Sequence, residues 1–267
     1  MSAHSRILTL LTDFGSRMGY VGQMKGVILS INAEARLIDL THEIPPQDIR
    51  AGAKVLQASH AYFPTGSIHL AVVDPEVGTS RPGVIVETET AFFIGPDNGL
   101  FGFLHNTKEI RAIHRIVNER YFLKQRSRTF HGRDVFAPVA AYLSLGYPAD
   151  EFGPGLDSLL PLPGALPHKE GRDLVGDVVA VDHFGNLISS INRNDLEIFR
   201  SENEGRELVV WCRGMMIPIL GTFAEAPKGE LLAYLGGGDD LEIAINFGNA
   251  AEKLNAEVGT SVKLMAL

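Results

Sequence analysis

The segment Ile7-Leu-Thr-Leu-Leu-Thr-Asp-Phe-Gly15 indicates the kind of fold that the first half of this chain adopts. An apolar run of strand length ends in a turn signal, and apolar residues then recur at helical spacing from Tyr20 to Ile31. The same order returns in residues 36–62, where a short strand precedes a helical pattern that opens on Pro45-Pro46. Strands that alternate with helices predict an α/β domain, with a central sheet covered by helices on both faces.

The rest of the first half continues this pattern, and the second half does not. Further strands are predicted at 67–73, 83–88, 91–95 and 109–117, before a last helix at 134–146. After these come short β-rich runs between turns, and only 248–254 reads as a helix. The second half is therefore predicted to be a small all-β, barrel-like domain. A Pro/Gly-rich stretch at 153–167 is taken as the linker, which gives domains at 1–165 and 166–267.

Composition excludes several classes of protein. The chain has 267 residues and a formal net charge of −8, which argues against nucleic acid or an anionic membrane as the main partner. A single cysteine, Cys212, cannot form an internal disulfide or hold a metal cluster. No run approaches the roughly 18 apolar residues of a membrane helix, and residues 1–6 do not begin a signal peptide. We expect a cytoplasmic protein.

Four polar residues of the first half are candidates for chemistry. Asp13 and Asp74 each follow a predicted strand, where ligands gather in such sheets. Asp13 is placed to bind a ribose diol, or else to cap a helix or turn. Asp74 shares a rigid Pro/Gly loop with Arg81, so the two form either a functional pair or an ordinary ion pair. His131 precedes a helix start, where it either faces a site or caps the helix.

The second half offers a purine-binding pattern and a glycine turn. Asp182-His-Phe-Gly-Asn186 combines a carboxylate, an aromatic face and an amide; Phe184 would stack on a base and Asn186 would pair with its edge. The same letters also make an ordinary turn. Gly237 and Gly238 lie in a turn whose bare amides suit a carboxylate, unless the turn is a plain hairpin. No histidine has metal-ligand spacing, so no metal is expected.

Taken together, these motifs resemble one family along nearly the whole chain, the S-adenosyl-L-methionine (SAM) hydroxide adenosyltransferases, which are related to the fluorinases and chlorinases. Each motif alone is weak, but their order and spacing together are specific. The matching segments are 11–15, 73–78 with Arg81, 95–99, 129–134, 182–186 and 241–243.

The resemblance implies that water or hydroxide displaces methionine from C5′ of the ribose, giving adenosine and L-methionine. It places an Asp–Arg–His set on the water, which falls on Asp74, Arg81 and His131, and a ribose-binding carboxylate on Asp13. Residues around adenine and the methionine head group fall on Asp182, Phe184 and Asn186. It also implies a homotrimer, in which the first domain of one chain faces the second domain of its neighbour. No cofactor is expected, since SAM is the substrate.

Two comparisons within the resemblance bear on the reaction. The halogenating relatives lack the acid at the position of Asp74 and carry an extra loop, so hydrolysis is favoured here over halogenation. The family usually has serines in the glycine turn that receives the substrate carboxylate. Gly237 and Gly238 replace them, and losing charge-assisted hydrogen bonds costs about 1.5–3 kcal/mol. A non-catalytic SAM or adenosine sensor is the alternative from another class.

The chemistry divides the work among three residues. A sulfonium leaves as a neutral thioether, so the leaving group needs no acid, and the difficulty lies with the water, whose pKa is about 15.7. We expect Asp74 to orient the water, Arg81 to stabilise incipient hydroxide and His131, which titrates near neutrality, to take the proton.

Overall fold

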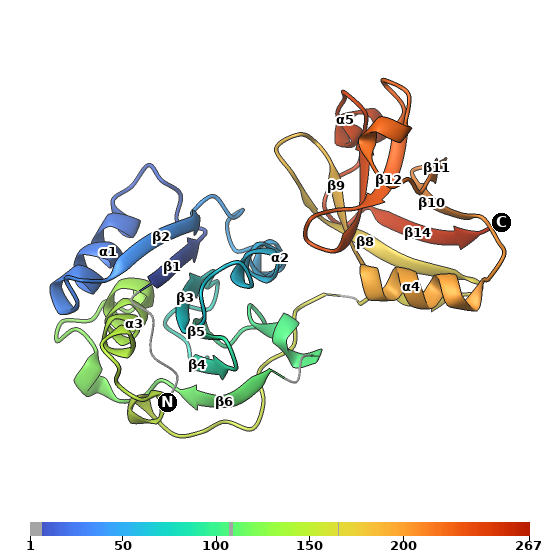
Figure 1. Ribbon diagram of the computed structural model, residues 1–267. Coiled ribbons are helices and arrows are strands. Elements are labelled where there is room, and N and C mark those ends of the chain that lie inside the picture. The colour runs from blue at the N-terminus through green and yellow to red at the C-terminus, as the bar shows by residue number, and fades with distance from the viewer. Residues whose placement is uncertain (1–6, 107–108, 165) are drawn as a thin grey trace. The chain divides into compact units, whose positions relative to one another are not determined.

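The computed structural model describes residues 7–106, 109–164 and 166–267 (Figure 1). The N-terminal residues 1–6, where no targeting segment is expected, lie outside this range. The chain divides after Pro163 into two compact units, each described here by itself. Within the described residues, no helix has both the length and the apolar character needed to cross a bilayer.

The first unit is built on a six-stranded mixed sheet in the order β2-β1-β3-β5-β4-β6. The inner neighbours β1–β2, β1–β3 and β3–β5 are parallel, whereas β4 runs antiparallel to both β5 and β6. The strands span Ile7–Thr12 (β1), Arg36–Thr41 (β2), Ser67–Val72 (β3), Gly83–Thr88 (β4), Ala91–Pro96 (β5) and Ile110–Arg115 (β6). All six were predicted, with ends that differ by two residues at most.

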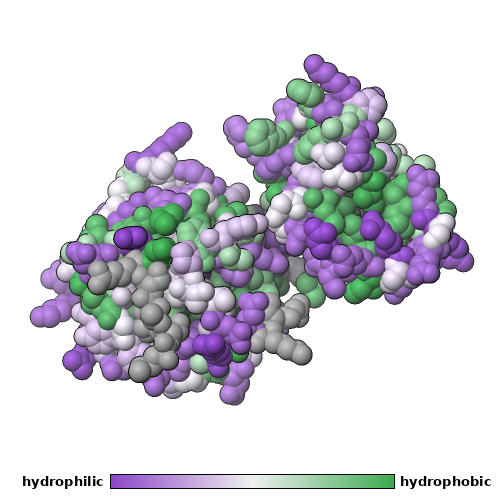
Figure 2. All heavy atoms as spheres, in the orientation of Figure 1, coloured by the Kyte–Doolittle hydropathy of each residue, from purple (hydrophilic) through white to green (hydrophobic). Residues whose placement is uncertain are grey.

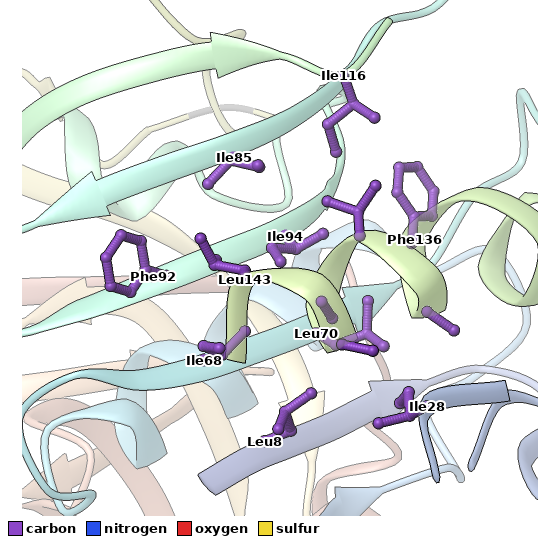
Figure 3. Close-up of a cluster of buried hydrophobic side chains, with 14 of the residues drawn as sticks. Leu8, Ile28, Ile68, Leu70, Ile85, Phe92, Ile94, Ile116, Phe136 and Leu143 are labelled. Carbon is purple, nitrogen blue, oxygen red and sulfur yellow. The ribbon is translucent and has the colours of Figure 1, made fainter. Parts of the chain in front are cut away.

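Helices cover both faces of this sheet, as predicted. One face packs against α1 and α3, and Figure 3 shows Ile28 of α1 and Leu143 of α3 beside the strand residues Leu8, Ile68 and Leu70. The other face packs against α2. The helices span Tyr20–Ile31 (α1), Ile49–His60 (α2) and Ala137–Ser144 (α3), with short 3-10 turns at 102–106, 119–121 and 149–152. Strands β1 and β3 are buried on both faces, which explains their continuous apolar runs.

The last helix of the first unit differs from its prediction at its start. A single π-helical turn, Gly132–Phe136, precedes α3. Such turns are rare and are found frequently at functional sites. The Pro/Gly-rich stretch also differs, because its first part packs on the first unit: Leu159 is buried, and the Leu160 N–H donates to Asp97 at 2.9 Å. The first part of this stretch therefore belongs to the first unit.

The second unit is an antiparallel, nearly closed sheet in the order β11-β10-β14-β8-β9-β13-β12, with β7 paired to β8. Just after β11, Ile219 forms a bridge with Ala233 of β12, and this bridge joins the two ends of the sheet. The predicted barrel-like form is confirmed. The strands span His168–Glu170 (β7), Asp173–Val181 (β8), Leu187–Asn192 (β9), Leu208–Cys212 (β10), Met215–Pro218 (β11), Leu231–Leu235 (β12), Asp240–Ile245 (β13) and Ser261–Ala266 (β14).

The second unit contains a helix that the sequence analysis missed. Helix α5, Ala250–Leu254, lies in the expected segment, but α4, Arg193–Glu202, contradicts the expectation of a single helix. A capping box between Asn192 and Asp195 starts α4, a signal that was readable in the sequence. Leu196 and Phe199 then anchor α4 in the apolar core of the barrel. Hydrophobic residues also show between hydrophilic ones on the face drawn in Figure 2.

Candidate functional site

The carboxyl ends of β1 and β3 are neighbours in the sheet of the first unit. The chain leaves β1 through α1 to β2 and returns through α2 to β3, on the other side of β1. Helices α1 and α2 cover opposite faces of the sheet, so the chain changes direction between β1 and β3. The carboxyl ends of these two strands therefore form a topological switch point, the place where open α/β sheets bind ligands. Thr12 pairs with Val72 in this register, so Asp13 and Asp74 leave neighbouring strands at the same edge.

Arg81 joins Asp74 and His131 in one side-chain network. The guanidinium donates to both Asp74 oxygens, through Nε at 2.9 Å and through Nη2, in a bidentate pair. The same Nη2 lies 3.1 Å from Nδ1 of His131. The side chains of Asp74 and Arg81 are only 4% and 6% exposed, so this is not the ordinary surface ion pair that the sequence left open. The structure thus brings together the three residues predicted to act on the water.

The contact with Arg81 sets the state of the His131 ring. Arg81 is a donor only, so Nδ1 of His131 accepts and the neutral ring carries its hydrogen on Nε2. Burial, and then the positive charge of Arg81, lower the pKa of His131, against opposing effects of Asp74 and Asp134. His131 is therefore a neutral ring at pH 7. It stands at the N-cap of the π-helical turn, without a side-chain capping bond.

The loops that carry these residues touch at one glycine. Gly78, between Asp74 and Arg81, has φ +84°, and a Cβ there would lie 2.5 Å from the Arg128 carbonyl oxygen. Only glycine fits both this conformation and this approach. A pocket of about 340 Å3 opens beside Arg81 and His131, and its lining includes Ser127 and Arg128.

Asp13 is held by a residue that the sequence analysis missed. Its Oδ2 accepts the Gln47 N–H at 2.8 Å, and Gln47 has φ +67°. His42 also fixes this segment: its Nδ1 lies 2.9 Å from the hydroxyl of the buried Thr12, and its carbonyl accepts the Gly15 N–H. The Pro45-Pro46 pair signalled a turn before Gln47, but a backbone contact 34 residues distant leaves no mark in the sequence.

The second unit holds Asp182, Phe184 and Asn186 in one tight turn. Asp182 Oδ1 accepts the N–H groups of Phe184 and Asn186, and its Oδ2 accepts the Asn186 side-chain amide at 2.8 Å. Asp182 therefore shapes the turn, whereas Phe184 is 72% exposed. Gly185 packs so closely on Asn249, the N-cap of α5, that a Cβ would collide with it. Asp182 thereby fixes the orientation of the Asn186 side-chain amide, and Asn186 is buried in the turn.

The glycine turn lies beside this segment, because Ile243 pairs with Leu187 in the β9–β13 ladder. Glu242 was not predicted as a site residue, yet its carboxylate fills the space over Gly236, where a Cβ would lie 1.9 Å from Oε1. Tyr234 donates a hydrogen bond to Glu242. Burial, followed by the nearby carboxylates of Asp182 and Asp240, raises the pKa of Glu242.

The turn itself, Gly236 to Asp240, is closed by two backbone hydrogen bonds. The Gly236 N–H donates to the Asp240 carbonyl, and the Asp239 N–H donates to the Gly236 carbonyl. A Cβ at Gly237 would meet nothing within 4 Å, so this position has open space around it. In the described part of the chain, no three His, Cys, Asp or Glu side chains are grouped to hold a metal ion.

Comparison with known proteins agrees with the two-unit division. The family model for the SAM hydroxide adenosyltransferase N-terminal domain matches residues 8–153, and the model for the C-terminal domain matches residues 176–263. The chain belongs to the SAM hydroxide adenosyltransferase family. The network of Asp74, Arg81 and His131 lies within the match to the N-terminal domain, and the turn at 182–186 lies within the match to the C-terminal domain.

Individual proteins are similar to this chain over nearly its whole length. The chain is 37% identical to the (R)-S-adenosyl-L-methionine hydrolase of Thermus thermophilus, over 97% of this chain and 100% of that protein. It is 35% identical to the protein of the same name from Salinispora tropica, over 97% of each. A crystal structure of an uncharacterized conserved protein from Thermotoga maritima superposes with a TM-score of 0.87 at 34% identity, covering 96% of this chain and 99% of that one. The fluorinase of Nocardia brasiliensis is a more distant relative, 26% identical over 97% of this chain and 96% of that protein.

Proposed function

We propose that this protein hydrolyses S-adenosyl-L-methionine to adenosine and L-methionine, by attack of water or hydroxide at C5′ of the ribose. The observation that carries the proposal is the buried network in which Arg81 bonds both Asp74 and His131. Family membership and the full-length relatives named SAM hydrolase support the same reaction. The bond that forms joins the water oxygen to C5′, and the bond that breaks joins C5′ to the sulfonium sulfur.

Arg81 supplies the charge that a developing hydroxide needs. Its guanidinium is held by Asp74 in a nearly water-free position, where charge–charge interactions are stronger than in water. Asp74 fixes the direction of the guanidinium and offers its carboxylate to orient the attacking oxygen. Because both Asp74 oxygens already accept N–H groups of Arg81, we assign Asp74 to orientation and not to proton removal.

His131 is the proposed proton acceptor, and its bond to Arg81 adds a condition. The neutral ring carries a hydrogen on Nε2, so a second proton enters at Nδ1, which Arg81 occupies. Proton uptake by His131 therefore requires the Arg81 N–H to leave Nδ1, and that N–H then becomes available to the attacking oxygen. The lowered pKa keeps the ring neutral before the reaction.

Substrate binding is proposed to use both units. Asp13, whose Oδ2 is already bonded to Gln47, would take the ribose hydroxyls through Oδ1. Phe184 would stack on adenine and Asn186 Oδ1 would accept from its amino group, while the amides of Gly237 and Gly238 would receive the substrate carboxylate.

The decisive experiment is incubation with SAM in H2-18O, followed by mass spectrometry. Equal amounts of adenosine and methionine, with 18O in the adenosine and none in the methionine, would support displacement at C5′. An unchanged SAM concentration over hours in the presence of bound ligand would instead indicate a sensor. Parallel reactions with fluoride or chloride test the halogenase alternative through formation of 5′-halo-adenosine.

We propose further that the enzyme acts as a homotrimer with its site between subunits, and that it needs no cofactor. The trimer is inferred from the family resemblance and from the presence of candidate residues in both units. Co-refolding inactive Asp74→Ala and Asn186→Ala chains tests it: activity should return in mixed trimers if the two residues act from different chains. Mixed trimers as inactive as either parent would contradict it. Full activity after EDTA treatment is expected, because the thioether leaves without assistance.

A further inference from the structure

Asp134 is a fully buried carboxylate next to the candidate site. The proposed reaction does not use Asp134 directly. It lies in the π-helical turn, and its side chain is 0% exposed. Its Oδ1 accepts from Arg133 Nε at 2.6 Å, and its Oδ2 accepts from the Ser127 N–H at 2.6 Å and from Arg133 Nη2 at 3.1 Å. A buried charge is costly unless it is paired and hydrogen-bonded, and Asp134 satisfies both conditions through these contacts.

These contacts close the loop that carries His131. The Leu123 N–H donates to the Asp134 carbonyl at 3.0 Å, while Ser127 bonds to its side chain, so residues 123–134 form a loop fastened at Asp134. Arg128, within this loop, presents the carbonyl on which Gly78 packs. The loop therefore carries the histidine that Arg81 bonds and also contacts the Asp74–Arg81 segment at Gly78.

Arg133, which pairs with Asp134, also contacts α1 and the ring of Phe130. Its Nη1 donates to Gln23 of α1 at 2.8 Å, and its guanidinium lies 4.8 Å from the centre of the Phe130 ring. Phe130 meets Phe14 edge-on at 5.7 Å, and a Cβ at Gly132 would lie 3.3 Å from the same Phe14 ring. Phe14 directly follows Asp13. Both neighbours of His131 in the sequence thus pack against the residue next to the proposed ribose ligand.

We propose that Asp134 is a positioning residue, which holds the 123–134 loop so that His131 Nδ1 faces Arg81. This inference rests on the proposed function. Asp134 touches no reacting atom and acts through Ser127 and Arg133. Because misplacement of a catalytic group by about 1 Å costs on the order of 100-fold in rate, weakening this fastening should lower kcat more than it raises KM.

The test compares Asp134→Asn with Glu119→Gln. Both substitutions remove one negative charge that pairs with an arginine in the 119–134 region, but Glu119 is exposed and pairs with Arg126. We expect kcat for SAM hydrolysis to fall at least tenfold in Asp134→Asn with KM within threefold, and both constants to stay within twofold in Glu119→Gln. A folded Asp134→Asn protein that keeps kcat within threefold would overturn the proposal, as would an equal loss in the control.

A second measurement needs no turnover. The ring of His131 is titrated by NMR in protein labelled with 13C-histidine and assigned with a His131→Gln sample. The charged groups around this ring are Arg81, Asp74, Asp134 and Arg126. Removing the Asp134 charge should lower the His131 pKa, and Glu119→Gln should leave it unchanged. An unmoved titration overturns the positioning role even if SAM is hydrolysed, whereas a shifted titration without adenosine production overturns only the proposed function.

A third variant covers the case in which Asp134→Asn does not fold. Arg133 is 29% exposed at its side chain, so Arg133→Gln weakens the same fastening from the surface. It should produce a smaller loss of kcat in the same direction, again with KM nearly constant. Unchanged kcat in Arg133→Gln together with an unmoved His131 titration would also overturn the proposal.

Discussion

The two units organise their candidate residues in opposite ways. In the first unit the polar groups are bonded to one another: Asp74 and Arg81 are almost fully buried, and His131 is tied to Arg81. In the second unit the Asp182 carboxylate accepts hydrogen bonds within its own turn, and the aromatic ring of Phe184 is exposed. This difference fits the proposed division, in which preorganised side chains of the first unit carry the chemistry and a turn shaped by Asp182, with an exposed aromatic ring, carries binding in the second. Substitutions should then affect rate in the first unit and affinity in the second.

The largest effect should come from breaking the buried network. Asp74→Ala removes the group that orients Arg81, and we expect kcat to fall by about 100- to 1000-fold or more, the range seen when a preorganised charged contact is lost. Affinity for adenosine, measured by calorimetry, should stay within about tenfold, or ~1.4 kcal/mol. The matched control is Glu76→Ala, an exposed acid on the same loop. Asp74→Ala protein that retains more than half the wild-type rate would remove Asp74 from the chemistry.

Lowering the pH should reduce the free energy of unfolding of the first unit more than that of the second. Burial, followed by the charge of His60, lowers the pKa of His69 in the first unit to about 3. The unfolded chain binds this proton near pH 6.5, so the free energy of unfolding of the first unit falls as pH drops from 6.5 towards 3, by about 1.4 kcal/mol per pH unit. Glu242 in the second unit has the opposite effect. Because its pKa is raised, it stabilises the folded second unit at pH values below the pKa of the unfolded chain, and this stabilisation is lost as pH rises.

We therefore expect the first unit to unfold first on acidification. Trp211 is the single tryptophan and lies in the second unit, so its fluorescence reports that unit while far-UV circular dichroism reports both. His69→Gln should reduce the acid sensitivity of the dichroism transition only. Coincident transitions by the two probes at every pH would show that the units unfold as one.

Substitution of Gly78 tests whether close packing between the Asp74 loop and the His131 loop holds the network in place. Gly78→Ala adds a Cβ 2.5 Å from the Arg128 carbonyl, whereas Gly205→Ala, at a similar positive φ, meets nothing within 4 Å. Both substitutions should lower the free energy of unfolding by roughly 1–2 kcal/mol, because alanine is strained in the left-handed backbone conformation. Only Gly78→Ala should lower kcat as well, by tenfold or more, because the Asp74 loop and the His131 loop must move apart. Equal kinetics in the two variants would contradict this role of the close packing.

The exposed ring of the second unit should give a pure affinity effect. Phe184→Ala removes a side chain that is 72% exposed, so the thermal midpoint should hardly change. Loss of stacking on adenine should weaken adenosine binding by about 1–3 kcal/mol, the value of base–aromatic stacking. Tyr62→Ala, which removes an exposed ring from the first unit, is the control. Unchanged binding in Phe184→Ala would place adenine elsewhere.

The smallest effect should be a gain. Gly237→Ser restores a hydroxyl to the glycine turn, where open space receives it without a clash. We expect tighter SAM binding by about 0.5–1.5 kcal/mol, a normal hydrogen-bond contribution, seen as a lower KM at constant kcat. Gly237→Ala separates the hydroxyl from the methyl group. No improvement over Gly237→Ala would mean that the backbone amides alone form this part of the site.

The same contrast explains what the sequence could predict. Helix α1 matches its predicted limits because apolar periodicity and a preceding glycine-rich turn mark it locally. Asp13 and Asp74 were found because strand ends are local features. Gln47, Gly78 and Asp134 were missed as partners, since their roles depend on backbone atoms far away in the sequence. Helix α4 was missed although its capping box, Asn192 with Asp195, is a local signal that the sequence contains.

The seam of the barrel has a consequence for self-association. The sheet has eight strands, and apart from β7, which pairs with β8, they follow one order that ends at β11 and β12. These two end strands are joined by the Ile219–Ala233 bridge. Pro218, which ends β11, has no N–H to offer a passing strand. The edge is blunted in two ways, although Met215 and Met216 beside it are exposed. If the seam opened, two unpaired edges next to apolar side chains would appear together, which is the pattern that leads to edge-to-edge aggregation.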